Sequence, residues 1–304
     1  MVALKNLLLQ TADREPFEVV VIVDGSTDDT IKLLTEFKAN FNLTFHYKEN
    51  GGLVSARNHG IRVAKGDVIV FMDDDILLDP LYIQNIYDNI KNYPDSVYIG
   101  NLFNVEIQFV KRIKRKIESG KTDIYSNMEK YCDSHPFYDA IKILFNIKNG
   151  NNLEPTVWWA VISGGNLAIP RKILNKVGGF DPQFKGWGPE DADLAYRIFK
   201  NGYSAKYFQQ CKIYHLDHPR DNKKLVQSMV KYAFMLCRKY DKKPEWIEYL
   251  RFFNSLISLK EFNNNCALIF GNNSIEIDDF YMKNFMEYRA VKSNTFERAK
   301  VSVP

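Results

Sequence analysis

The sequence has little of what marks membrane, disulfide-rich or nucleic-acid-binding proteins. Its four cysteines form no CxxC pair, which argues against a zinc ribbon or a disulfide scaffold and fits a reducing compartment. No apolar run approaches the ~20 residues that span a bilayer. The net charge is only +4, too small to indicate nucleic acid. We expect a cytoplasmic protein, at most peripheral to a membrane.

The composition is that of an ordinary folded protein, with 45% hydrophobic and 26% charged residues among 304. After about residue 220 the chain changes to helix-like, aromatic and lysine-rich segments with few glycines. We therefore predict a main domain at residues 1–220 and a mainly helical extension at residues 221–304.

Strand-like and helix-like segments alternate in the main domain. Short β-branched runs at 18–23 and 67–72 are typical of strands buried on both faces. The alternation predicts an α/β fold with a mostly parallel sheet, which binds ligands beyond the carboxyl ends of its strands. The expected strands are 18–23, 45–48 and 67–72, and the expected helices are 31–38, 54–64 and 81–91.

Three aspartates, Asp73, Asp74 and Asp75, directly follow the strand at 67–72. Adjacent carboxylates repel one another by about 1 kcal/mol per pair at 4 Å in bulk water. Mg²⁺ or Mn²⁺ would offset that repulsion, because both ions prefer oxygen ligands. The alternative is a solvated acidic turn that caps the next helix.

Two further polar groups lie near expected strand ends. Asp24 directly follows the strand at 18–23 and precedes a predicted helix. It either belongs to the cap of that helix or accepts hydrogen bonds from a base or ribose. Arg57 follows the turn Asn50–Gly52, and its planar, permanently charged guanidinium suits phosphate. The alternative for Arg57 is an ordinary surface arginine.

The segment GWGPEDAD at 186–193 has the composition of a helix start, with Pro189 and acids in the first turn. That role does not explain Trp187 between two glycines, where its ring is free to stack on a ligand. Asp191 lies beside other acids, which would raise its proton affinity as a general base requires.

Two of the five histidines, His215 and His218, lie close together in HLDHPR. An imidazole added to a carboxylate-rich site would favour Mn²⁺ over Mg²⁺. Otherwise they are ordinary surface or core histidines.

These motifs, in their order along the chain, resemble those of a nucleotide-sugar glycosyltransferase of the GT-A fold that is similar to family 2. Residues 178–198 with HLDHPR resemble the carboxyl-terminal segment shared by β-1,4-galactosyltransferases, chondroitin polymerases and polypeptide N-acetylgalactosaminyltransferases. The resemblance covers roughly residues 1–220 and implies a Rossmann-like, mostly parallel sheet flanked by helices. The matching motifs are Asp24–Ser26, Asn50–Gly52 with Ala56–Asn58, Asp73–Asp75 and Gly164–Asn166.

The resemblance implies a metal-dependent, inverting transfer of a hexose or N-acetylhexosamine. The donor would be a UDP-sugar, the acceptor a hydroxyl of a glycan or lipid-linked molecule, and the cofactor Mn²⁺ or Mg²⁺. On the donor side, Asp24 and Arg57 would hold the uridine and diphosphate and Asp73 the ribose, with Asp74 and Gly165 beside them.

For the metal, the resemblance implies Asp75 and His218 as ligands, with His215 as a second imidazole. Asp191 would be the catalytic base that deprotonates the acceptor. The sugar and acceptor pocket would be lined by Trp187, Gly188 and Glu190.

One departure from the family concerns its usual first strand, which is absent before the helix-like ALKNLLLQT. Either the sequence is truncated, or residues 266–270 (CALIF), followed by Gly271, supply a replacement strand in this chain or a partner's. The missing strand keeps open a non-catalytic sugar-binding or nucleotide-sugar-binding module, and a sugar nucleotidyltransferase is a further alternative.

The basic stretch KRIKRK at 111–116 has two interpretations. It forms a solvated helix face, or it docks on anionic lipid, which would suit a lipid-linked acceptor. The aromatic, helix-like segments after residue 220 are expected to serve packing or homo-oligomerisation.

Overall fold

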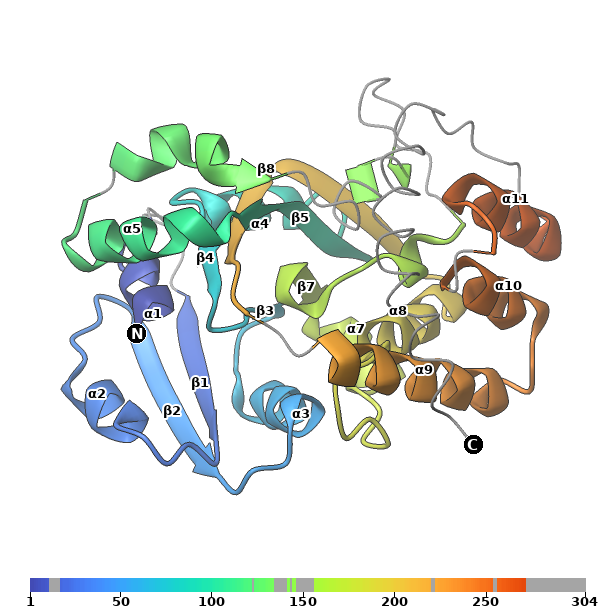
Figure 1. Cartoon of the computed structure of the whole chain (residues 1–304), viewed down its shortest axis with the longest axis horizontal. Coiled ribbons are helices and arrows are strands. Elements are labelled where there is room, and N and C mark those ends of the chain that lie inside the picture. Colours follow the sequence, from blue (N-terminus) through green and yellow to red (C-terminus); the bar gives the residue numbers. More distant parts are fainter. Residues whose placement is uncertain are drawn as a thin grey trace. The chain divides into compact units, whose positions relative to one another are not determined.

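A computed structural model gives the fold of most of the chain (Figure 1). It describes residues 1–10, 17–121, 123–133, 141–142, 144–145, 156–219, 222–253 and 256–271. The chain forms two compact units. Unit 1 comprises residues 1–134, 163–185 and 200–218, and unit 2 comprises residues 135–162, 186–199 and 219–304. Unit 2 therefore includes the segment GWGPEDAD, and a catalytic domain at 1–220 stays a prediction.

Unit 1 begins with a small parallel sheet after helix α1 (Val2–Leu7). Strands β1 (Glu18–Asp24) and β2 (Asn42–Lys48) pair in parallel and are connected through helix α2 (Thr30–Glu36). Helix α3 (Leu53–Val63) packs against β1. The predicted strand at 18–23 is confirmed, whereas the strand predicted at 45–48 begins earlier, at Asn42.

The larger sheet of unit 1 is mixed, so the expectation of a mostly parallel sheet is wrong for it. Among the strands that the structure describes, only β5 and β8 pair in parallel, and the other pairs in this sheet are antiparallel. Strand direction depends on pairing between distant segments, which local periodicity does not encode. The order is β3 (Val68–Phe71), β7 (Leu167–Pro170), β5 (Ser96–Val105), β8 (Ser204–Leu216) and β4 (Ile76–Leu78), with β6 (Cys132–Asp133) beside β5.

The two sheets are separate among the described residues. There β1 pairs only with β2, and β3 pairs only with β7. No described strand occupies the second edge of β1 or of β3.

The strand predicted at 266–270 is wrong, because these residues are the last turns of helix α11 (Leu259–Phe270). Ser258 and Glu261 form a reciprocal capping box at its start, and Gly271 ends it with a left-handed φ of 71°. Both are local helix signals, and they outweigh the strand-like composition of CALIF. The helix predicted from about residue 278 lies outside the described residues.

Helices cover the larger sheet of unit 1. Helix α1 packs on β4 and on α5 (Ile107–Glu118), and α4 (Tyr82–Ile90) packs on β8. The Asn6 side chain exchanges two hydrogen bonds, of 2.8 and 2.9 Å, with the backbone of Leu78. A buried cluster beneath α5 joins these elements: Leu77, Val105, Ile113, Ile117, Ile124, Met128, Tyr214 and Leu216.

Unit 2 is helical in its described part. The prediction of a mainly helical extension after residue 220 is therefore confirmed as far as residue 271. Its helices are α8 (Glu190–Lys200), α9 (Asn222–Lys239), α10 (Pro244–Phe253) and α11. The core is aromatic: Trp159 and Trp246 are fully buried with ring centroids 4.9 Å apart. The buried Asp193 carboxylate is bound by Arg197 (3.0 Å), Lys239 (2.6 Å) and Tyr240 (2.7 Å).

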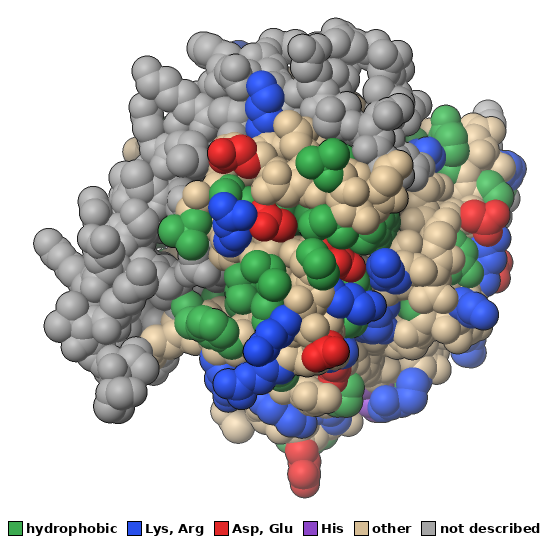
Figure 2. Space-filling model, turned by 90° about the vertical axis from the view of Figure 1, so that its right-hand side faces the viewer, with side chains coloured by type: hydrophobic (Ala, Val, Ile, Leu, Met, Phe, Trp, Pro, Cys, Tyr) green, Lys and Arg blue, Asp and Glu red, His purple; other side chains and the backbone are tan. Residues whose placement is uncertain are grey.

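Charge is unevenly distributed over the surface. On the face drawn in Figure 2, lysines and arginines mix with acidic and hydrophobic side chains. Helix α5 has a basic exposed face, because its buried positions are isoleucines and four of its cations are exposed: Lys111, Arg112, Lys114 and Arg115. Among the described residues, no helix combines the length and hydrophobicity of a membrane span.

Candidate functional site

The three adjacent aspartates form the turn between β3 and β4. The Ile76 amide donates to the Asp73 carbonyl at 3.1 Å, and the Leu216 amide donates to the Asp75 carbonyl at 2.8 Å. Because β4 pairs antiparallel with β8, Ile76 lies opposite His215. This pairing brings the end of β8 to the acidic turn.

A carboxylate and two imidazoles meet at this turn. The Asp75 Oδ2 atom lies 3.3 Å from Nε2 of His215 and 3.2 Å from Nε2 of His218. Each residue offers one ligand atom, and the three atoms lie within 4.8 Å of one another. The side chain of His215 is 8% exposed and that of His218 is 48% exposed, so the cluster runs from the interior to the surface. The donor set fits a divalent transition metal.

One neighbour of this cluster was missed by sequence reasoning. The Asn104 Oδ1 atom of β5 lies 2.9 Å from Nδ1 of His215. An asparagine inside a strand gives no local signal of such a role. The contact follows from the register of β5 and β8, in which Asn104 lies opposite His215.

Arg57 is not an ordinary surface arginine, since its side chain is only 8% exposed. Its Nη2 atom lies 3.0 and 3.4 Å from the two Asp73 carboxylate oxygens, and its guanidinium lies over the Phe180 ring, 5.3 Å from the centroid. A Cβ added at Gly165 would lie 3.0 Å from Asp73 Oδ2, so a larger residue there would crowd the carboxylate. Asp74 is exposed at the same turn.

The Asp24 carboxylate binds the turn after β2. It accepts hydrogen bonds from the amides of Gly51 (2.9 Å) and Gly52 (2.7 Å) and from Lys48. Burial alone would raise the pKa of Asp24, but these hydrogen bonds outweigh burial and lower it below the usual value. Asp29 is the N-cap of α2, so Asp24 does not cap that helix.

The predicted residues of segment 186–193 lie in unit 2. Glu190 begins α8, is 2% exposed and accepts a hydrogen bond from the Gly188 amide at 2.9 Å. A Cβ on Gly188 would lie 2.8 Å from Cδ2 of Tyr232. Trp187 is 41% exposed, and Asp191 lies half-buried in the first turn of α8. The predicted helix start is therefore confirmed.

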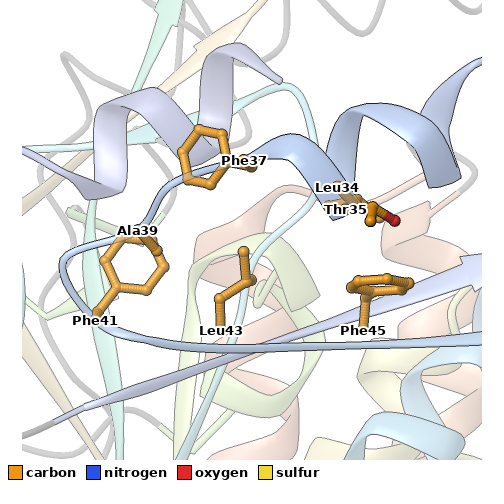
Figure 3. Close-up of a pocket in the computed structure, with 7 residues that line it drawn as sticks. All are labelled: Leu34, Thr35, Phe37, Ala39, Phe41, Leu43 and Phe45. Carbon is orange, nitrogen blue, oxygen red and sulfur yellow. The ribbon is translucent and has the colours of Figure 1, made fainter.

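A separate apolar pocket of about 370 Å³ lies between α2 and β2 (Figure 3). The side chains of Leu43 and Phe45 point from β2 toward the helix. Its lining contains no ionisable side chain and none of the residues discussed above, so it offers no acid–base chemistry. The lining residues are Leu34, Thr35, Phe37, Ala39, Phe41, Leu43 and Phe45.

Two family models match the chain. The model of glycosyl transferase family 2 matches residues 2–178. A second model, described as the N-terminal domain of galactosyltransferase, matches residues 147–219. Together they cover the acidic turn, both histidines and the segment 186–193.

Curated relatives are glycosyltransferases of greater length. Validoxylamine A glucosyltransferase of Streptomyces hygroscopicus subsp. jinggangensis is 26% identical over 258 residues, which cover 78% of this chain and 57% of the relative. The uncharacterised glycosyltransferase YfnE of Bacillus subtilis is 27% identical over 263 residues, covering 79% and 66%. Chondroitin synthase of Escherichia coli is 26% identical over 212 residues, covering 67% and 31%. The chain thus spans only part of each relative.

Solved structures are similar in fold at low identity. Staphylococcus aureus TarS aligns with a TM-score of 0.56 and 18% identity, covering 85% of this chain and 43% of TarS. The mannosyltransferase PcManGT of Pyrobaculum calidifontis, solved with GDP-Man and Mn²⁺, aligns with a TM-score of 0.56 and 18% identity, covering 88% and 69%. At this identity the likeness establishes the fold alone.

Proposed function

This chain belongs to glycosyl transferase family 2 and has the GT-A fold, and we propose that it is a metal-dependent, inverting glycosyltransferase. It moves a hexose or N-acetylhexosamine from a UDP-sugar to a hydroxyl of a glycan or lipid-linked acceptor. The observation that carries the proposal is the meeting of Asp75, His215 and His218 at the end of β8.

The donor set of this cluster fits Mn²⁺ better than Mg²⁺. Two imidazole nitrogens join one carboxylate, whereas Mg²⁺ favours sites made of oxygen ligands alone. Asp75, His215 and His218 would hold the ion. When bound, the metal neutralises charge on the departing diphosphate, so that no protein acid is required.

The remaining residues divide the work between donor and acceptor. Arg57 fixes the Asp73 carboxylate, which we assign to the donor ribose, and Asp24 holds the glycine turn beside the nucleotide. Asp191 takes the proton of the acceptor hydroxyl. The acceptor oxygen then bonds to the anomeric carbon from the face opposite the diphosphate, as the bond between that carbon and the diphosphate oxygen breaks and UDP leaves.

The donor nucleotide is supported by structures of similar fold. A TarS fragment has been solved with UDP-GlcNAc and aligns with a TM-score of 0.50 and 15% identity. PcManGT was solved with GDP-Man, so the fold accommodates two different nucleotides. We assign UDP because of the motif resemblance, and GDP-mannose is the competing donor.

Nucleoside diphosphate release tests the function. The donor panel is UDP-glucose, UDP-galactose, their N-acetylated forms and GDP-mannose. With Mn²⁺, we expect the protein to release UDP from one of the UDP-sugars and no GDP from GDP-mannose. A panel of glycan acceptors should stimulate release, and EDTA should abolish it until Mn²⁺ is restored. Binding of donors without release would instead support the non-catalytic module, and GDP release alone would overturn the choice of UDP.

We also propose that α5 docks on anionic lipid, which would keep the enzyme peripheral to a cytoplasmic membrane. Lys111 and Arg115 are exposed on α5, and Ile107 at its start is 55% exposed. Lys116 is paired with Asp123 at 3.0 Å and contributes less. Exposed cations beside an apolar side chain suit the surface of an anionic bilayer.

Vesicle co-sedimentation tests this docking. Lys111→Ala with Arg115→Ala should weaken binding to phosphatidylserine-containing vesicles about 30-fold, because each cation near such a surface contributes about 1 kcal/mol. Lys32→Ala with Lys38→Ala, two exposed lysines near α2, removes the same charge and should leave binding unchanged. Equal losses in both variants, or no binding by the parent protein, would contradict the proposal.

A further inference from the structure

The Asn104 side chain contacts His215, one of the three proposed metal ligands. The two residues lie opposite each other in the parallel ladder of β5 and β8, with Asn104 Oδ1 2.9 Å from His215 Nδ1. The other ring nitrogen, Nε2, lies 3.3 Å from the Asp75 carboxylate. The ring is thus held between an amide on one strand and a carboxylate at the acidic turn.

The two nitrogens of a neutral imidazole have opposite roles: one carries a proton and the other has a free lone pair. A metal binds only the nitrogen with the lone pair, and the hydrogen bond made by the other nitrogen selects the tautomer. An amide oxygen accepts hydrogen bonds and cannot donate them. In a neutral ring whose Nε2 faces a metal ion, an oxygen facing Nδ1 therefore keeps the proton on Nδ1 and leaves the lone pair on Nε2.

We propose that Asn104 is a positioning residue that holds His215 as the Nδ1–H tautomer, with the Nε2 lone pair aimed at a divalent ion beside Asp75. The inference rests on the proposed metal site and adds to it the residue that orients one ligand. His215 is only 8% exposed, so water is poorly placed to replace the amide. Removing the hydrogen-bond partner of a metal-binding histidine typically weakens metal affinity 10- to 100-fold.

Strand β5 offers a matched control in Asn101. It is the same residue type, is 5% exposed, and lies opposite Lys212 instead of His215. Replacing it with alanine removes a buried amide from the same strand without touching the histidine. A general effect of damaging β5 would appear equally in both variants.

The first experiment measures Mn²⁺ affinity of the full chain by electron paramagnetic resonance titration. Asn104→Ala should weaken Mn²⁺ binding about 10- to 100-fold. Asn104→Asp keeps an oxygen acceptor and should bind at least as tightly as the parent. Asn101→Ala should bind like the parent, provided that thermal unfolding shows it to be folded. Equal affinity in Asn104→Ala and the parent would overturn the proposal.

The second experiment reads the tautomer without metal. Nitrogen-15 NMR of the imidazoles in the metal-free protein should show His215 protonated on Nδ1, and Asn104→Ala should shift the proton toward Nε2, which faces Asp75. A parent ring with no proton on Nδ1 would overturn the proposal. If the tautomer is as expected but the parent binds no Mn²⁺, the proposed metal site fails while the hydrogen-bond assignment stands.

Discussion

Replacing Asp75 with asparagine should lower Mn²⁺-dependent turnover about 10²–10³-fold, because a metal supplies several kcal/mol of transition-state charge stabilisation. Asp75 contributes the only carboxylate of the described ligand group, with its Oδ2 atom 3.2–3.3 Å from the two imidazole nitrogens. Asparagine keeps the shape and one oxygen but loses the negative charge that a divalent cation prefers. The measurement is UDP release as a function of Mn²⁺ concentration.

The control for this variant is Asp67→Asn. Asp67 is exposed and precedes β3, whereas Asp75 follows the other end of that strand. Its substitution makes the same chemical change far along the strand and should leave turnover and Mn²⁺ dependence unchanged. Turnover by Asp75→Asn at the parent's rate and Mn²⁺ concentration would contradict the metal assignment.

Local patterns in the sequence predicted the first elements because those elements are locally determined. The β-branched run at 18–23 forms β1, and the helix predicted at 54–64 is α3 within a residue at each end. The larger sheet was not predictable in the same way. Its strands β5, β7 and β8 pair across more than a hundred residues in some cases, and their directions depend on those partners.

Prediction of the candidate site from the sequence is limited in the same way, by contacts between distant strands. Residue types alone suggested a metal at Asp75 with His215 and His218, but their meeting depends on the antiparallel pairing of β4 with β8. Asn104 was missed because its role exists only through the β5–β8 register. The helix at 266–270, where a strand was predicted, does have a local sequence signal, the capping box of Ser258 and Glu261.

Asp191→Asn should lower kcat about 10²–10⁴-fold, the usual contribution of a positioned general base. The donor KM should change little, because the substitution removes a proton acceptor and leaves the proposed donor-side residues intact. Two further acids lie in the first turn of the same helix. Glu190 accepts from the Gly188 amide, and Asp193 binds Arg197, Lys239 and Tyr240.

Asp193, in the same turn of α8, gives Asp191 a matched comparison. Asp193→Asn should destabilise unit 2 by about 1–3 kcal/mol, because it weakens charged hydrogen bonds to a fully buried carboxylate, and should lower Tm. Asp191→Asn should lose turnover at an unchanged Tm and with donor binding retained. If Asp191→Asn instead lowers Tm and spares turnover in the fraction that stays folded, Asp191 is a structural acid like its neighbours, and the base must be sought elsewhere.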